Sequence, residues 1–360
     1  MTQHRPLVVV RDETLVEEIL RLAAAVGCET ERAPDLPAAR ESWERAPLVL
    51  VDEPVLDGEL PRRSGIVLVI KGPPEPETWR QAFESGVERV VSLPDGEPAL
   101  VSALADIAEG PGDPGGCVIG VVGGRGGAGA SVLAATIGMV ASRRGDALLI
   151  DCDPLGGGVD LLLGAELASG LRWPGILVGG GRVSMPALAE ALPEHRHRGG
   201  RLPFVSCDRE AGGPTATAIA SVVDAGRRAG TVVVCDLPRH FGPESEAVLD
   251  RADLTVLVVP AEVRACVAAK HVAQKVAEKM GGPGRIRLIV RGPAPGGLHP
   301  DQAAKAVGVP LLTSMAPERQ LDRTVENGAF EPRPRGPLVR AARLVLAQTR
   351  AGLATFEAAA

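Results

Sequence analysis

The chain has 360 residues, of which 45% are hydrophobic and 23% charged, so it is not a disordered chain, and two domains are the first expectation. The net charge is −6, no long run of lysine or arginine occurs, and the aromatic residues are 5 Phe and 3 Trp with no Tyr. These features argue against a basic surface and against an aromatic platform for stacking bases, and we therefore expect no nucleic-acid partner.

The cysteines and the apolar segments indicate a cytoplasmic protein. The six cysteines are scattered without Cys-x-x-Cys spacing, and several lie inside apolar, strand-like runs, which is typical of reduced core residues. The apolar stretch near the N-terminus is too short for a signal peptide, and no window approaches the roughly 18 apolar residues of a membrane span. Binding at the inner face of the membrane or at the septum is the alternative to a free cytoplasmic location.

Residues 1–110 alternate between short apolar runs and helical patterns. The apolar runs cover residues 7–10, 48–51, 66–70 and 90–93. Between and after them, Leu15, Ile19 and Leu22 share one helical face, and Leu100 and Leu104 share another. Such an alternation predicts an α/β domain with a parallel, doubly wound sheet. The run PGDPGG at 111–116 can hold neither helix nor strand and marks a linker.

In its order of elements and in phrases such as APLVLVDEPVLDGE, the segment 5–110 resembles a response-regulator receiver domain, which has a flavodoxin-like fold. Asp52 matches the phosphoaccepting aspartate at the end of the third strand of that family. The other receiver positions hold different side chains: Arg11 and Asp12 at the acidic pair, with Glu13 beside it, Lys71 at the hydroxyl position, and Leu93 at the lysine position.

One carboxylate beside an arginine is a poor cage for the divalent cation that an acyl-phosphate site needs. Asp52 is then either a vestigial phosphoacceptor or only a strand-end aspartate. We interpret residues 1–110 as a degenerate receiver-like domain that docks partners.

The second half opens with a strand, a glycine loop and a helix. The apolar strand covers 117–122, the sequence GGRGGAGAS follows at 123–131, and an apolar helical pattern begins at Val132. Glycines at such a junction let successive backbone N–H groups turn inward, and the helix N-terminus adds partial positive charge. The pattern predicts a phosphate-binding loop.

Carboxylates follow two further predicted strands of this half. Asp151 and Asp153 come after the strand at 147–150, and Asp236 comes after the strand at 231–235. Additional strands are predicted at 254–259 and 287–290. Ligands of open α/β sheets bind at the carboxyl ends of the strands, where these aspartates are expected to lie.

Residues 117–350 resemble the MinD/ParA family of deviant-Walker ATPases, and within it the CpaE/TadZ branch and the actinobacterial septum-site-determining proteins. The motifs that carry the resemblance are RGGAGAS, LLIDCDP, VVVCDLP, ADLTVLVVPAE and LIVRGP, in the family's order. The resemblance implies a P-loop NTPase domain with a mainly parallel doubly wound sheet, a C-terminal tail at 351–360, ATP and Mg²⁺ as ligands, and a homodimer.

The resemblance also assigns roles to individual positions. It implies nucleotide contacts at Gly124, Arg125, Gly126, Gly127, Ala128, Gly129, Ala130, Ser131, Val132 and Arg291. Ser131 and Asp236 match the Mg²⁺ site, Asp151 supports the metal from behind, and Asp153 matches the residue that orients the attacking water. The alternative for the three aspartates is that they cap the turn that follows each strand.

Three positions depart from the family's pattern: Arg125 at the signature lysine that crosses the dimer, Ala130 at the Walker lysine, and Arg291 at the base-reading asparagine. Losing one charge-assisted hydrogen bond weakens binding roughly ten- to hundredfold. Losing a cation that stabilises the transferred phosphoryl group slows hydrolysis about a thousandfold or more. We therefore expect ATP binding with weak or absent hydrolysis, unless Arg125 of the partner subunit compensates.

Three weaker signals remain. His195 and His197 have metal-chelating spacing, but a solvated loop is the favoured interpretation. Trp173 is expected either to contact a partner or to anchor a loop. The amphipathic stretch 337–356 has few cations, so packing on the domain is favoured over membrane docking.

Taken together, the patterns and the resemblance imply a nucleotide-dependent spatial regulator. It would act in septum placement during cell division or in the polar assembly of a pilus or secretion machine. The alternatives are an active ATPase that cycles between dimer and monomer and a scaffold that binds no nucleotide.

Overall fold

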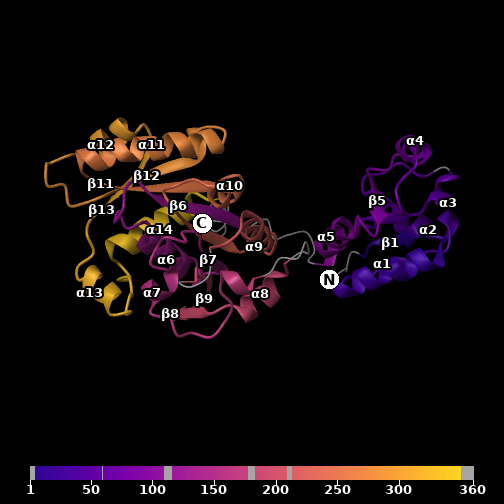
Figure 1. Cartoon of the computed structure of the whole chain (residues 1–360), viewed down its shortest axis with the longest axis horizontal. Helices are drawn as coiled ribbons and strands as arrows, with labels where there is room; N and C mark the ends of the chain where they lie inside the picture. Colours follow the sequence, from indigo (N-terminus) through magenta and orange to yellow (C-terminus); the bar gives the residue numbers. More distant parts are fainter. Residues whose placement is uncertain (1–4, 59, 109–115, 177–182, 209–212, 350–360) are drawn as a thin grey trace. The chain divides into compact units, whose positions relative to one another are not determined.

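The computed structural model describes residues 5–58, 60–108, 116–176, 183–208 and 213–349. These residues form two compact units, one within 5–108 and one within 116–349 (Figure 1). Of the linker expected at 111–116, only Gly116 is described, and the tail expected at 351–360 lies outside the described residues.

The first unit is a five-stranded parallel sheet in the order β2-β1-β3-β4-β5. Its strands are β1 (Leu7–Val9), β2 (Glu31–Arg32), β3 (Val49–Val51), β4 (Ile66–Lys71) and β5 (Arg89–Leu93). Its helices are α1 (Glu13–Ala25), α2 (Leu36–Trp43), α3 (Glu53–Leu56), α4 (Pro76–Glu84) and α5 (Glu97–Ala108).

Both faces of this sheet are covered. Leu15, Ile19 and Leu22 of α1 and Leu100 and Leu104 of α5 are buried in one hydrophobic core, as their spacing predicts. Helices α2, α3 and α4 contribute to a separate core on the other face. The short strand β2 escaped prediction because both of its residues are exposed and charged, which leaves no apolar pattern.

The second unit is an eight-stranded sheet in the order β13-β12-β11-β6-β10-β7-β9-β8, parallel except for β8. Its strands are β6 (Cys117–Gly123), β7 (Ala147–Asp151), β8 (Glu194–His197), β9 (Gly200–Val205), β10 (Val232–Leu237), β11 (Leu254–Pro260), β12 (Ile286–Arg291) and β13 (Leu311–Met315).

The helices of this unit lie on both faces of the sheet. One core includes side chains of α6 (Ala130–Ala141), α7 (Val159–Leu163) and α14 (Pro337–Ala347). The other face is covered by α8 (Met185–Ala191), α9 (Ala216–Arg228), α10 (Pro243–Leu249), α11 (Val263–Lys279) and α12 (Pro300–Val307). Short elements complete the unit: η1 (Trp173–Gly175), η2 (Pro283–Arg285) and α13 (Leu321–Glu326).

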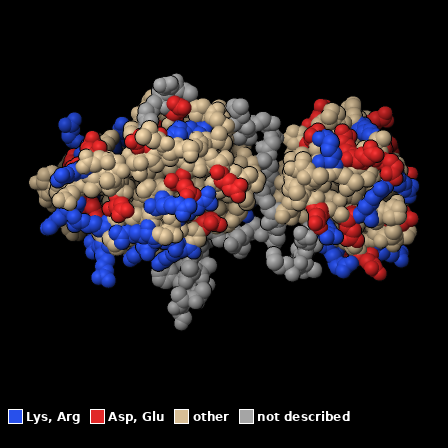
Figure 2. Space-filling model, turned by 90° about the horizontal axis from the view of Figure 1, so that it is seen from below, with Lys and Arg blue, Asp and Glu red and all other residues tan. Residues whose placement is uncertain are grey.

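The C-terminal amphipathic helix packs on the second unit, as its composition predicted. The apolar face of α14, from Leu338 to Leu346, is buried in the same core as α6. Among the described residues, no helix is both long and apolar enough to span a membrane. On the face of the first unit that Figure 2 shows, basic and acidic side chains are mixed.

The solvated loop expected around His195 and His197 is instead a strand, and this expectation was wrong. Residues 194–197 pair antiparallel with β9 across a two-residue turn, Arg198 and Gly199, in which both φ angles are positive (49° and 84°). Turns of this kind favour asparagine or aspartate before glycine, so an arginine there gives no hairpin signal in the sequence. The His197 side chain is buried, with its ring stacked near that of His195.

Candidate functional site

The glycine loop joins the end of β6 to the start of α6. Gly127 and Gly129 adopt φ angles of 68° and 92°, which residues with a side chain rarely tolerate. Gly129 is the N-cap residue of α6 and has no side chain with which to accept a hydrogen bond. The N–H groups of the first helical turn, at Ala130, Ser131 and Val132, therefore have no capping side chain and suit an anion.

Other loop residues serve the fold. The Gly124 N–H donates to the Val258 carbonyl at 2.8 Å, and a Cβ at Gly124 would lie 2.7 Å from the Cβ of Ala269. Ala128 is buried in the core, whereas Gly126 and Gly127 are exposed. The loop is thus anchored at its start and open at its centre.

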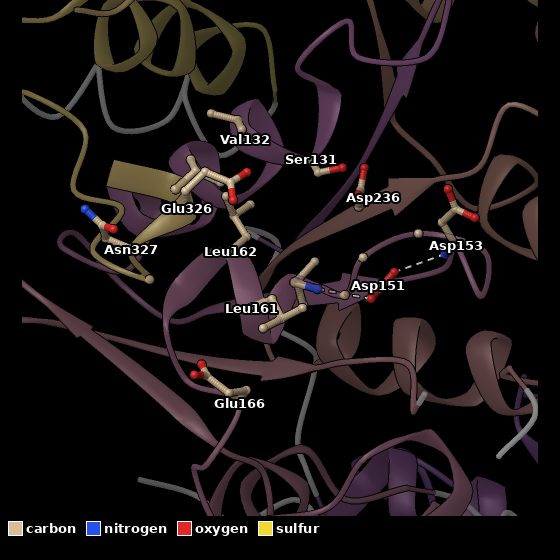
Figure 3. A pocket seen from close by; sticks show the side chains of 16 residues that line it. Ser131, Val132, Asp151, Asp153, Leu161, Leu162, Glu166, Asp236, Glu326 and Asn327 are labelled. Carbon is tan, nitrogen blue, oxygen red and sulfur yellow. Dashed lines mark hydrogen bonds between the residues drawn. The ribbon is translucent and has the colours of Figure 1, made fainter. Parts of the chain in front are cut away.

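Ser131 and Asp236 lie side by side at the carboxyl edge of the sheet (Figure 3). Ser131 projects from the first turn of α6, and Asp236 comes from β10, the strand beside β6. Burial raises the pKa of Asp236 to about 8, with a further rise from Asp151 and Asp153, while the hydrogen bond to Ser131 lowers it. A buried carboxylate with so little compensation favours a bound cation.

Asp151 holds the backbone that follows β7. Its Oδ1 accepts the N–H of Asp153 at 3.1 Å, and its Oδ2 accepts those of Val159 at 3.2 Å and Cys207 at 3.3 Å. Burial raises its pKa to about 6, and these N–H groups lower it. The capping role that the sequence left open for Asp151 is therefore present in the structure.

Trp173 anchors this same strand end. Its ring is buried, and its Nε1–H donates to the Asp151 carbonyl at 2.6 Å. Of the two roles that the sequence left open, loop anchoring is the one that the structure shows. Asp153, by contrast, is half-exposed, and its Oδ1 accepts the Leu155 N–H at 3.1 Å.

A cavity of about 620 Å³ opens beside these residues. It is lined by Ser131, Val132, Asp151, Asp153 and Asp236, by α7 and the loop before it, and by Glu326 and Asn327 at the end of α13 (Figure 3). The described residues contain no group of three or more His, Cys, Asp or Glu side chains arranged to hold a metal. Ser131 and Asp236 fit Mg²⁺ in the way that enzymes of phosphate substrates hold it, with few protein ligands and the remainder from phosphate and water.

Three arginines surround the loop. Arg125 donates to Glu262 Oε1 at 2.9 Å and to the Gly126 carbonyl at 3.0 Å. Arg291 lies against Gly129, because a Cβ atom added to Gly129 would be only 3.2 Å from Nη1 of Arg291. Arg239 was missed by the sequence analysis. A Cβ atom added to Gly126 would lie 3.6 Å from Nη2 of Arg239. Its only sequence signal is its place three residues after Asp236.

The first unit places Asp52 at the carboxyl end of β3. Its side chain is 3% exposed, and its Oδ2 accepts the N–H groups of Arg11 at 2.6 Å and Asp12 at 3.0 Å. Lys71 forms an ion pair of 2.8 Å with Asp12, not with Asp52. Asp12 also caps α1 by accepting the N–H groups of Thr14 and Leu15.

The cysteines and the pair His195 and His197 are the other titratable groups that the sequence analysis considered. The six cysteines are buried and unpaired, as their scattered positions predicted. Burial lowers the pKa of His195 and of His197, which favours neutral rings.

Both units are similar to known proteins. The sequence model of the family described as "Rv3660c-like, CheY-like N-terminal domain" matches residues 9–115. Over 342 residues the chain is 42% identical to the protein Rv3660c of Mycobacterium tuberculosis strain H37Rv, which covers 93% of this chain and 95% of that protein.

Two solved structures share the fold of the second unit. The ParA family ATPase from Chlorobium tepidum has a TM-score of 0.55 and 16% identity, and covers 66% of this chain and 99% of its own. The septum site-determining protein MinD from Pyrococcus horikoshii, complexed with Mg-ADP, has a TM-score of 0.53 and 18% identity, and covers 66% and 98%. A CheY-like domain is thus followed by a P-loop domain with the MinD/ParA fold, as the sequence predicted.

Proposed function

The chain belongs to the family of Rv3660c-like proteins, and we propose that its second unit binds ATP and Mg²⁺ at the glycine loop. The observation that carries this proposal is that an uncapped helix N-terminus and a buried carboxylate meet at one sheet edge. The first turn of α6 lacks a capping side chain, and the buried Asp236 has Ser131 beside it. A helix N-terminus without a capping side chain favours a bound anion, and the buried carboxylate of Asp236 favours a bound cation.

Each ligand has residues suited to it. The loop N–H groups from 126 to 132 would hold the phosphates, except that of Ala128, which donates to the Arg125 carbonyl at 3.3 Å. Ser131 and Asp236 would hold Mg²⁺, with Asp151 fixing the strand end behind them. Bound Mg²⁺ would neutralise phosphate charge and orient the phosphates. The complex of the Pyrococcus MinD with Mg-ADP supports the choice of ligands.

Hydrolysis should be weak or absent. Ala130 offers no cation to the transferred phosphoryl group, and a missing cation of this kind costs about a thousandfold or more in rate. Asp153 is half-exposed in the cavity, and its Oδ2 accepts no hydrogen bond from a described residue. This supports a second candidate, an active ATPase in which Asp153 orients the attacking water.

On the cellular scale, we propose a cytoplasmic, nucleotide-dependent spatial regulator that dimerises. The septum-placement role and the alternative role in pilus or secretion assembly come from the resemblance to the CpaE/TadZ branch and to septum-site-determining proteins. The receiver-like unit would dock the partner. Trp79 and Phe83, one turn apart on α4, support this role because they are 53% and 86% exposed.

An equilibrium titration with labelled ATP and ADP, with and without Mg²⁺, tests nucleotide binding. We expect saturable binding that Mg²⁺ strengthens. Absence of binding at millimolar nucleotide would leave the scaffold alternative. In the same samples, phosphate release separates the two nucleotide-dependent candidates, because turnover that is lost in Asp153→Ala is expected only for an active ATPase.

Sedimentation of the full chain with and without ATP and Mg²⁺ tests dimerisation. A nucleotide-dependent dimer is expected, and Arg125→Ala should reduce it if Arg125 leaves Glu262 to reach the phosphates of the partner subunit. Equal dimer fractions in the wild type and the variant would contradict that role of Arg125.

A further inference from the structure

The side chain of Arg291 lies across the glycine loop at the point where the lysine is missing. Arg291 ends β12, and a Cβ built on Gly129 would lie 3.2 Å from its Nη1 and 3.8 Å from its Cδ. Gly129 immediately precedes Ala130, the Walker lysine position. The absent side chain at 129 therefore makes room for a guanidinium beside position 130.

The charge of Arg291 is not neutralised within the described part of the chain. Its Nε is buried and has no hydrogen-bond partner there, and it forms no ion pair with a described residue. The Nε of Arg125 is also buried without a hydrogen-bond partner among the described residues, but Glu262 neutralises the charge of Arg125 at 2.9 Å. A buried donor that is left unsatisfied costs free energy, which a ligand with acceptor oxygens can recover.

The surroundings of Arg291 leave space for such a ligand. Gly129, Val132 and Arg291 line a cavity of about 200 Å³, together with Glu318 and Asp322. Glu318 is engaged elsewhere, because it accepts the N–H groups of Arg333 at 3.3 Å and Leu338 at 3.5 Å. Asp322 is exposed to solvent, and Arg291 forms an ion pair with neither carboxylate. The guanidinium is thus the cation that lines this cavity, rather than one half of an ion pair.

We propose that Arg291 binds the phosphate chain of the nucleotide from within its own subunit and replaces the missing lysine. This inference rests on the proposed nucleotide site and names what that site recognises, a polyphosphate rather than a particular base. The planar guanidinium donates two parallel hydrogen bonds to phosphate oxygens, which a lysine at 130 could not do. Because Arg291 then contacts phosphate, ATP, GTP and inorganic tripolyphosphate should bind with similar affinity.

Calorimetric titration of the full chain with these three compounds and with adenosine, in the presence of Mg²⁺, tests the proposal. Arg291→Ala should weaken binding of all three polyphosphate compounds roughly ten- to hundredfold. The matched control is Arg287→Ala, on the same strand, where the guanidinium donates to the carbonyls of Gly284 and Ile286. This control should bind as the wild type does.

Two further variants separate charge from folding. Arg291→Lys should keep most of the affinity, and adding Ala130→Lys to Arg291→Ala should restore binding of tripolyphosphate. If Arg291→Ala weakens ATP binding but not tripolyphosphate binding, Arg291 contacts the base and the proposal is wrong. If the wild type binds nucleotide and Arg291→Ala binds equally well, this inference fails while the proposed function stands. Failure of the wild type to bind any polyphosphate overturns both.

Discussion

The carboxyl edges of the two sheets place aspartates in similar positions but treat their charges differently. In the first unit, Lys71 is paired with Asp12, and one oxygen of Asp52 accepts two backbone N–H groups. In the second unit, Asp236 is buried beside Ser131, and Arg291 forms no ion pair with a described residue. At the first edge the ion pair and the backbone N–H groups engage these charges, except at the buried Oδ1 of Asp52, which has no hydrogen-bond partner among the described residues. At the second edge Arg125 is paired with Glu262, whereas Asp236 and Arg291 form no ion pair with a described residue.

This difference shows where a ligand would stabilise the protein. Ion pairs and backbone contacts that are already made leave a ligand little to add, because it must break them before it binds. An uncapped helix, a buried carboxylate and an unpaired guanidinium each cost free energy in the ligand-free chain. A ligand of matched charge would remove these costs, so this criterion supports the glycine-loop edge as the proposed ligand site.

The largest effect is expected from a side chain at Gly129 that blocks the glycine loop. Gly129→Val places a β-branched side chain at a φ of 92° and against Arg291, and should reduce ATP affinity at least a hundredfold. Thermal melting with ATP and Mg²⁺ measures the loss as a vanished nucleotide-dependent rise in Tm. Gly86→Val is the control, since Gly86 has a φ of 77° in the first unit with no atom within 4 Å. An intact rise in Gly129→Val would rule out the loop as the site.

The buried carboxylate should make the ligand-free protein less stable as the pH rises. Asp236 has a folded pKa of about 8, against an ordinary value of 3.8, so the folded state holds a proton that the unfolded state releases. Between about pH 6.5 and 8.5 the free energy of unfolding should fall by about 2 kcal/mol from this group, and below about pH 6 Asp151 adds to the same trend.

Chemical denaturation of Asp236→Asn, without nucleotide, checks this effect. The variant should lose most of the pH dependence in that window, whereas Asp250→Asn, which removes an exposed carboxylate, should keep it. Identical slopes in wild type and Asp236→Asn would show that the carboxylate is already compensated in the ligand-free chain.

Removing the anchor of β7 should have a smaller effect. Trp173→Phe keeps a buried aromatic ring but loses part of the indole volume and the hydrogen bond from Nε1 to the Asp151 carbonyl, which together should lower the free energy of unfolding by about 1 to 2 kcal/mol. Urea denaturation measures the change. Trp79→Phe, at an exposed site in the first unit, should leave the stability near that of the wild type. Equal stability of Trp173→Phe would mean that the carbonyl finds another donor.

The sequence predicted the parts of this comparison that depend on local pattern. Apolar runs followed by aspartates placed Asp52, Asp151 and Asp236 at strand ends, and the glycines marked the loop before α6. It did not reveal that Arg291 crosses Gly129, because that approach depends on packing between elements more than 150 residues apart. Periodicity indicates which residues are buried, not which side chains meet across neighbouring strands.

The sequence also failed to predict two polar strands and one exposed arginine, for a related reason. Strands β2 and β8 are charged, so neither has an alternation of apolar residues to distinguish it from a loop. Arg239 lacks any periodic neighbour and is exposed, and only the structure places its guanidinium beside the glycine loop. Sequence patterns reveal buried apolar side chains, and they miss exposed polar side chains whose neighbours are set by the fold.

The last prediction expects no chemical change at the carboxyl edge of the first unit. Asp52 is 3% exposed, its Oδ1 is buried, and its Oδ2 accepts two N–H groups, so neither oxygen is placed to attack a phosphodonor. Lys71 and Leu93 also stand where the receiver family has a hydroxyl and a lysine. Incubation with acetyl phosphate and Mg²⁺ should leave the intact mass unchanged. A hydroxylamine-labile adduct that disappears in Asp52→Asn would show that this edge still accepts a ligand, and the contrast between the two sheet edges would then be lost.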